Sequence, residues 1–145
     1  MQPIAGVLVA ETGHGKFEQS VVAGEHRYLA DEPVSAGGNG SGPSPYEYLI
    51  AGLGACTSMT IRLYADLKKI PLARVLVALR HDKIHATDCA ECETREGKID
   101  RIDREVTLVG DLSAEQRKKL MEIADKCPVH RTLTSEIHIV TRTAD

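Results

Sequence analysis

A long helix whose central part carries no charge constrains this chain more than any other feature of its sequence. Ser44 as N-cap, Pro45 at the first helical position and Glu47 three residues after the serine make a capping box that opens the helix. Pro71 cannot continue a helix, so the segment ends shortly before it. The pattern predicts a single helix of about 25 residues.

The helix is apolar on all of its faces over more than three turns. No residue from 49 to 61 is charged, so the segment has to be covered all round rather than along one stripe. A single small domain has difficulty providing that cover. We therefore expect an obligate homodimer, in which Gly52 and Gly54 allow another backbone to approach closely.

The composition bounds the class of protein. With 145 residues, 42% of them hydrophobic and 27% charged, we expect one domain, residues 1–145. A net charge of −3 without a basic stripe, one Phe and no Trp argue against nucleic acid as a partner. No apolar run approaches a membrane span, so we expect no membrane association and a cytoplasmic location. In that reducing compartment, four cysteines indicate redox or metal chemistry rather than a disulfide framework.

The remaining segments alternate in the manner of antiparallel strands. Three short apolar runs separated by glycines predict a meander, over residues 4–9, 17–22 and 27–30. A glycine-rich loop, residues 35–44, leads to the long helix. Beyond Pro71, two alternating runs predict a hairpin with an acidic tip at residues 86–98.

The C-terminal third predicts one more helix and one more strand. Ser113 and Gln116 have capping-box spacing, and the apolar face that follows ends at Cys127. Residues 136–142 alternate cleanly and predict a closing strand. The predicted order is βββ-α-ββ-α-β, an α+β fold.

Two cysteines in different settings suggest thiol redox chemistry. Cys56 lies in a run of small residues that leaves room for a small reactant, and Cys127 lies at a helix end, where it can move to form a disulfide. A thiolate that attacks the terminal oxygen of a hydroperoxide becomes a sulfenic acid, which a second thiol condenses to a disulfide. The alternative is two inert core cysteines.

The thiolate of Cys56 needs a nearby cation. The helix begins twelve residues earlier, so its N-terminus cannot act on Cys56. At Cys127, the end of one helix raises the thiol pKa, whereas a new helix beginning at Pro128 lowers it. The sequence does not choose among five candidate cations: Arg27, Lys16, His14, His130 and Arg131.

Glu47 has a sufficient structural role as a helix cap. Nine residues of helix turn about half a circle and rise about 13 Å, so Glu47 and Cys56 cannot touch within one chain. If Glu47 orients an activating cation, the site combines groups from two chains.

The hairpin tip is a second candidate site. Cys89 and Cys92 form a C-x2-C pair, and His81 and His85 precede it. These side chains suit zinc, although the two histidines lie about 13 Å apart on a straight strand, so only one of them joins the cysteines comfortably. A redox couple and a solvated tip are the other interpretations.

The chain resembles the OsmC/Ohr family of osmotically inducible and organic hydroperoxide resistance proteins. The likeness rests on residues 42–47, on 54–56 and on 127–130, and it extends over nearly the whole length. Residues 56–60, 81–85 and 88–92 look closest to the OsmC-like domains that occur alone or fused behind an α/β-hydrolase. The resemblance implies an intertwined homodimer with active sites at the subunit interface.

The resemblance also implies an activity. It implies a peroxidase for organic hydroperoxides, with Cys56 peroxidatic and Cys127 resolving, recycled by small or lipoyl-linked dithiols and without a cofactor. Two features depart from the hydroperoxidases of the family, because Glu47 lies one position later than their Glu and the early glycine turn offers His14 or Lys16 in place of Arg. The alternatives are a non-enzymatic dimer that binds a ligand or metal, and a redox sensor that uses Cys89 and Cys92.

Overall fold

The computed structural model describes residues 6–145 and divides them into two compact units. The first unit comprises residues 6–49 with 139–145, and the second comprises residues 50–138. Each unit is described by itself below. The single domain expected from the length remains a prediction.

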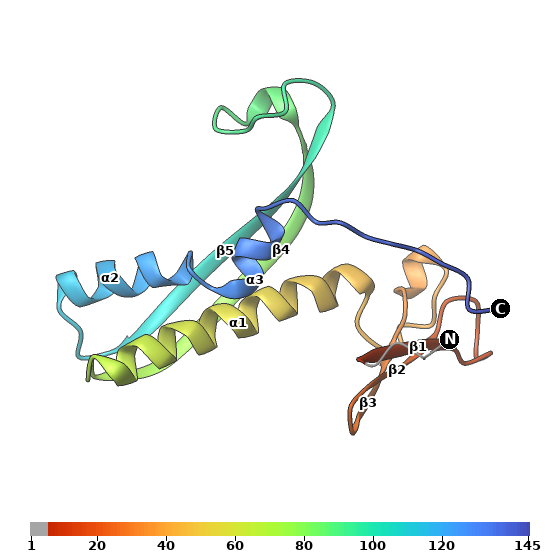
Figure 1. Cartoon of the computed structure of the whole chain (residues 1–145), viewed down its shortest axis with the longest axis horizontal. Helices are drawn as coiled ribbons and strands as arrows, with labels where there is room; N and C mark the ends of the chain where they lie inside the picture. The colour runs from red at the N-terminus through yellow and green to blue at the C-terminus, as the bar shows by residue number, and fades with distance from the viewer. Residues whose placement is uncertain (1–5) are drawn as a thin grey trace. The chain divides into compact units, whose positions relative to one another are not determined.

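The first unit is built on a three-stranded antiparallel meander (Figure 1). Strand β1 (Val7–Glu11) pairs with β2 (Gln19–Ala23), which pairs with β3 (His26–Ala30). Between β2 and β3 the chain reverses at Gly24, whose φ of 62° suits glycine. The predicted meander is confirmed with shifted ends, and residues 4 and 5 of its predicted first strand lie outside the described part of the chain.

A buried carboxylate organises the glycine-rich loop after β3. The Asp31 carboxylate accepts hydrogen bonds from the Ser41 hydroxyl (2.7 Å) and from the amides of Glu32, Asn39 and Ser41 (2.8, 3.1 and 3.2 Å). These bonds, the Ser41 hydroxyl first, hold the pKa of Asp31 below its ordinary value. Gly38 is required, because a Cβ there would lie 2.0 Å from the Glu32 carbonyl oxygen. Apart from one 3-10 turn, η1 (Val34–Ala36), the loop is irregular, as predicted.

Helix α1 (Pro45–Leu67) begins with the predicted capping box. The Ser44 amide donates to the Glu47 carboxylate (2.9 Å), and the Glu47 amide donates to the Ser44 hydroxyl (3.3 Å). Hydrogen bonding from Ser44 to the carboxylate, from its backbone amide first and its side chain second, holds the pKa of Glu47 below its ordinary value. The helix ends where Lys69 adopts a φ of 56° and the Ile70 amide donates to the Ala65 carbonyl.

Only one stripe of α1 is covered within the chain. Its buried side chains recur at intervals of four residues: Leu53, Thr57, Ile61 and Ala65. On another face Met59, Leu63 and Leu67 are 71%, 63% and 72% exposed. Large apolar side chains exposed on one face of a helix are compatible with cover by a partner, which stays a prediction.

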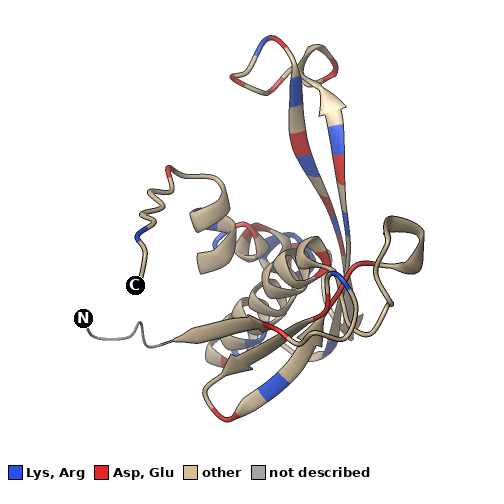
Figure 2. Ribbon diagram, turned by 90° about the vertical axis from the view of Figure 1, so that its right-hand side faces the viewer, with Lys and Arg blue, Asp and Glu red and all other residues tan. Residues whose placement is uncertain are grey.

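The second unit consists of a long hairpin with helices against it. Strands β4 (Leu72–His85) and β5 (Lys98–Gly110) form a two-stranded antiparallel sheet, as predicted. Helix α2 (Ala114–Ala124) has the predicted capping box of Ser113 and Gln116. The core lies between α1, α2 and the end of the hairpin away from its tip: Ile61, Ala65, Leu72, Leu108, Leu120, Ile123 and Ala124. The tip projects beyond these helices (Figure 1), and acidic and basic residues alternate along both strands (Figure 2).

The predicted closing strand is wrong for the single chain. Helix α3 (Pro128–Leu133) follows α2, and residues 136–142 belong to no strand. A strand gains its backbone hydrogen bonds from a neighbouring edge, and the chain does not pair this segment with one. Its apolar side chains stay exposed, with Ile137, Ile139 and Val140 at 52%, 82% and 75%.

No helix within residues 6–145 is long and apolar enough to cross a membrane.

Candidate functional site

The structure brings Cys56 and Cys127 together from two elements of the second unit. Cys56 lies in the middle of α1, and Cys127 is the N-cap of α3. Both are free thiols, and the Cys56 side chain lies near enough to Cys127 to lower the pKa of that thiol. Cys127 is fully buried, whereas Cys56 is half-buried. The pair therefore has one sheltered sulfur and one that is open to small molecules.

Helix α3 stabilises the thiolate of Cys127. The Cys127 sulfur accepts a hydrogen bond from the His130 amide (3.2 Å), and Pro128 occupies the first helical position. Burial raises the pKa of Cys127, but hydrogen bonds from this amide and from the Thr57 and Cys56 side chains, together with the charge of Arg104, leave it below its ordinary value. The sequence left open whether the end of the preceding helix raises the pKa of Cys127 or the start of a new helix lowers it. In the structure, the start of α3 lowers it.

The Thr57 hydroxyl lies between the Cys127 sulfur and the guanidinium of Arg104. This hydroxyl is fully buried, donates to the Leu53 carbonyl (2.7 Å) and lies 3.7 Å from the Cys127 sulfur. It also accepts a hydrogen bond from Nη1 of Arg104 (3.0 Å). The threonine thus fixes the guanidinium next to the sulfur pair.

Arg104 is the functional residue that the sequence analysis missed. It lies on β5, its side chain is 12% exposed, and its Nη2 donates to the exposed Asp125 carboxylate (2.7 Å). The signal was present in the strand alternation, because residue 104 shares a face with Ile102, Val106 and Leu108. A lone arginine on the core-facing side of a strand is a candidate for a buried ionic role.

The five cations expected from the sequence are placed differently. His130 acts through its backbone amide, and Arg131 lies in the last turn of α3. The other three, Arg27, Lys16 and His14, belong to the first unit, where His14 lies 3.4 Å from the Glu18 carboxylate. Within residues 6–145, none of these five side chains is hydrogen-bonded to either thiol, and Arg104 is the cation whose charge acts on Cys127.

Glu47 keeps the structural role that its position predicted. It belongs to the first unit and its hydrogen bonds are those of the capping box of α1.

The glycines of α1 differ in their surroundings. A Cβ on Gly54 would lie 2.6 Å from Cδ1 of Leu79, so this glycine lets β4 of the same chain approach, not a second backbone as expected. A Cβ on Gly52 would meet nothing within 4 Å in the chain, which leaves its predicted role at a subunit contact as a prediction.

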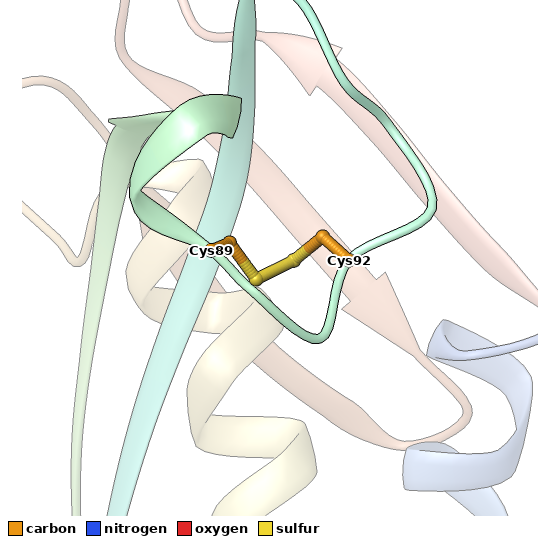
Figure 3. The surroundings of a disulfide bond; sticks show 2 residues. All are labelled: Cys89 and Cys92. Atoms are coloured by element: carbon orange, nitrogen blue, oxygen red, sulfur yellow. A yellow bond between two sulfur atoms is a disulfide. The ribbon is translucent and has the colours of Figure 1, made fainter.

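The hairpin tip holds a disulfide between Cys89 and Cys92 (Figure 3). The Cys89 residue follows a 3-10 turn, η2 (Ala86–Asp88), and His81 is hydrogen-bonded to Asp100 (2.9 Å). Within the described residues, no group of three or more His, Cys, Asp or Glu side chains is arranged to hold a metal ion. The redox-couple interpretation of this motif remains a prediction.

Two neighbouring thiols, one of them a stabilised thiolate, can lose two electrons together and form a disulfide. The half-buried Cys56 sulfur is accessible to an oxidant, and the buried Cys127 sulfur is next to it to close the bond. Arg104 and the N-terminus of α3 favour the anion that such chemistry requires.

Comparison with known proteins places the chain in a family. The model of the family described as OsmC-like protein matches residues 38–142, so the chain belongs to the OsmC family. Sequence comparison with curated proteins finds no match.

Solved structures share the fold at low identity. An OsmC-like protein from Mycoplasma pneumoniae has a TM-score of 0.68 at 19% identity, covering 92% of this chain and 89% of that one. An organic hydroperoxide resistance protein OsmC from Legionella pneumophila has a TM-score of 0.63 at 20% identity, covering 92% of each chain. One from Elizabethkingia anophelis has a TM-score of 0.64 at 18% identity, covering 92% and 90%. These likenesses confirm the predicted α+β, OsmC-like fold.

Proposed function

We propose that the protein is a homodimeric thiol peroxidase that reduces organic hydroperoxides, with Cys56 as the peroxidatic and Cys127 as the resolving cysteine. The observation that carries the proposal is the contact between the half-buried Cys56 thiol and the buried, anion-stabilised Cys127 sulfur. Similarity to proteins named for organic hydroperoxide resistance supports the choice of oxidant.

The first half of the reaction is the attack on the peroxide. The Cys127 thiolate takes the proton of the neighbouring Cys56 thiol. The Cys56 thiolate then attacks the terminal oxygen of ROOH, so that an S–O bond forms, the O–O bond breaks and RO⁻ leaves. The alkoxide takes the proton now held by Cys127 and departs as ROH, leaving Cys56 as a sulfenic acid beside a Cys127 thiolate.

The second half closes the disulfide. The Cys127 thiolate attacks the Cys56 sulfur and expels hydroxide, which takes a proton from solvent to become water. The two thiols lose two electrons and the hydroperoxide gains them. An external dithiol then reduces the Cys56–Cys127 bond by thiol–disulfide exchange and becomes a disulfide itself.

Arg104 is proposed as a positioning residue in this site. It is held by Thr57 on one side and by Asp125 on the other, so its charge acts on the thiolate from a fixed place. A guanidinium stays protonated at every pH of interest, so its effect persists through the catalytic cycle.

A second copy of the chain is the proposed cover for α1. Met59, Leu63 and Leu67 form an exposed apolar stripe at helical spacing, and the unpaired segment 136–142 alternates as a strand without an edge. A dimer interface buries both features. Because Glu47 and Cys56 cannot touch within one chain, Glu47 is proposed to reach the thiols of the other copy across the dimer interface.

Peptide mapping after one equivalent of cumene hydroperoxide tests the proposal. The expected product is a Cys56–Cys127 disulfide in the wild-type protein. In Cys127→Ser, a sulfenic acid trapped by dimedone at Cys56 is expected, and Cys56→Ser should lose turnover. A dimedone adduct on Cys127 in the Cys56→Ser variant would reverse the two roles, and no oxidation of either residue would refute the peroxidase.

A further inference from the structure

The hairpin tip carries a second pair of sulfurs that the proposed peroxidase chemistry does not use. Cys89 and Cys92 are bonded to each other, with their Cα atoms 5.4 Å apart, while Cys56 and Cys127 are free thiols. The tip extends beyond the helices that carry the thiol pair (Figure 1). The two pairs are thus separate sites in the second unit.

The bond does not tie the hairpin together. Both cysteines lie in the loop after β4, three positions apart, so the disulfide does not connect one strand to the other. The base of the loop is closed instead by the Ala86 amide, which donates to the Gly97 carbonyl (2.8 Å). This bond comes directly after the last pair of the two strands, His85 with Lys98. Because a disulfide that closes so short a ring constrains the unfolded chain little, breaking it should leave the hairpin intact.

The sulfurs are accessible to a reactant. Both cysteines are half-buried rather than sealed in a core. They line an open hollow of about 430 Å³, whose other charged lining residues are Asp88, Glu91, Asp100 and Arg101. The apolar walls come from Ile84 and Ile99. A small molecule with two thiols fits the size of such a hollow.

We propose that Cys89–Cys92 is a second redox site, which exchanges electrons with small uncharged dithiols independently of Cys56 and Cys127. A thiolate of the dithiol attacks one sulfur of the pair, forming a mixed disulfide and releasing the other sulfur as a thiolate. The second thiol of the reactant then displaces the protein sulfur. The protein pair gains two electrons and two protons, and the dithiol leaves as a cyclic disulfide.

The charge around the pair predicts which dithiols react. The tip carries four acidic residues and one basic residue between positions 88 and 96: Asp88, Glu91, Glu93, Glu96 and Arg95. Anionic reactants are repelled at low ionic strength, and salt screens that repulsion. We expect the uncharged dihydrolipoamide to reduce the pair about threefold faster than the anionic dihydrolipoate, after the rate of each is divided by its rate with an uncharged model disulfide. Both reactants close the same five-membered disulfide ring and differ only in charge.

Differential alkylation of the folded wild-type protein tests the site, because peptide mapping follows Cys89 and Cys92 apart from the other thiols. Millimolar dithiothreitol should reduce the pair within minutes, with unchanged near-ultraviolet circular dichroism, and oxidised dithiothreitol should restore the bond. Glu91→Gln should narrow the difference between the two dithiols.

The same measurement in Cys56→Ser/Cys127→Ser separates this proposal from the peroxidase. Exchange that persists there supports the second site whatever the fate of the peroxidase proposal. Reduction only under denaturing conditions, loss of the folded signal on reduction, or two thiols that never bond in oxidised dithiothreitol would each overturn it. Capture of the reduced pair by Zn²⁺ in place of reoxidation would also overturn it.

Discussion

Replacing Thr57 by valine tests whether its hydroxyl supports Arg104 and the thiol pair. The valine keeps the branched shape of the fully buried side chain and removes the oxygen that accepts from Arg104 at 3.0 Å. A hydrogen bond to a charged group contributes about 1.5–3 kcal/mol. Arg104 retains Asp125 and is 12% exposed, so we expect the lower half of that range, about 2 kcal/mol.

The chain offers a matched control three residues further along α1. Thr60 makes the same bond to the carbonyl four residues earlier, at 2.7 Å to Cys56, as Thr57 makes at 2.7 Å to Leu53. Arg104 donates to Thr57 rather than to Thr60, and the Thr60 side chain is only half-buried. Thr60→Val therefore reproduces the loss of the intrahelical bond, and we expect it to cost about 0.5 kcal/mol or less.

Urea unfolding at a fixed protein concentration measures both variants. With a slope of about 2 kcal/mol per molar, Thr57→Val should lower the midpoint by about 1 M and Thr60→Val by about 0.2 M. The ultraviolet absorbance of the buried Cys127 thiolate should also appear at a higher pH in Thr57→Val, since the pKa of Cys127 loses a stabilising hydrogen bond. Equal midpoints for the two variants would refute the reasoning about Arg104.

Two further predictions concern stability. Leu120 is fully buried in the core of the second unit, so Leu120→Ala should cost about 2–5 kcal/mol in urea unfolding. Its neighbour Met121 is 43% exposed, so Met121→Ala should cost much less stability. Equal losses of stability in the two variants would contradict the placement of Leu120 in the core. The pKa of Asp31 is lowered first by the Ser41 hydroxyl, so its carboxylate stabilises the fold above the unfolded pKa, near 3.9, and this contribution is lost as pH falls through the lower folded pKa. Asp31→Asn should therefore flatten the decline of Tm below about pH 4, and an unchanged decline would exclude this role.

The elements that the sequence predicted correctly have local signals. Ser44 with Glu47 and Ser113 with Gln116 each specify a helix start within four residues, and both capping boxes form. The hairpin of β4 and β5 follows from alternation along each strand. Cys127 was correctly expected to face the core, because the apolar periodicity of the preceding helix extends to it.

The failures depend on partners distant in sequence. Residues 136–142 alternate like a strand, but alternation does not supply the edge that a strand needs. Arg104 falls within one of the alternating runs and nothing in the sequence marks it, because only the tertiary structure shows Thr57 and Asp125 on either side of it. Asp31 gave no signal, because a single acid before a glycine-rich loop does not reveal which amides will turn toward it.

Helix α1 makes the two compact units inseparable as fragments. The boundary falls after Leu49, whereas the helix runs from Pro45 to Leu67. A fragment that ends at the boundary keeps five helical residues, too few to persist in water, and one that begins there loses the capping box and starts on an uncharged stretch. Domain dissection at this point should therefore yield pieces that do not fold.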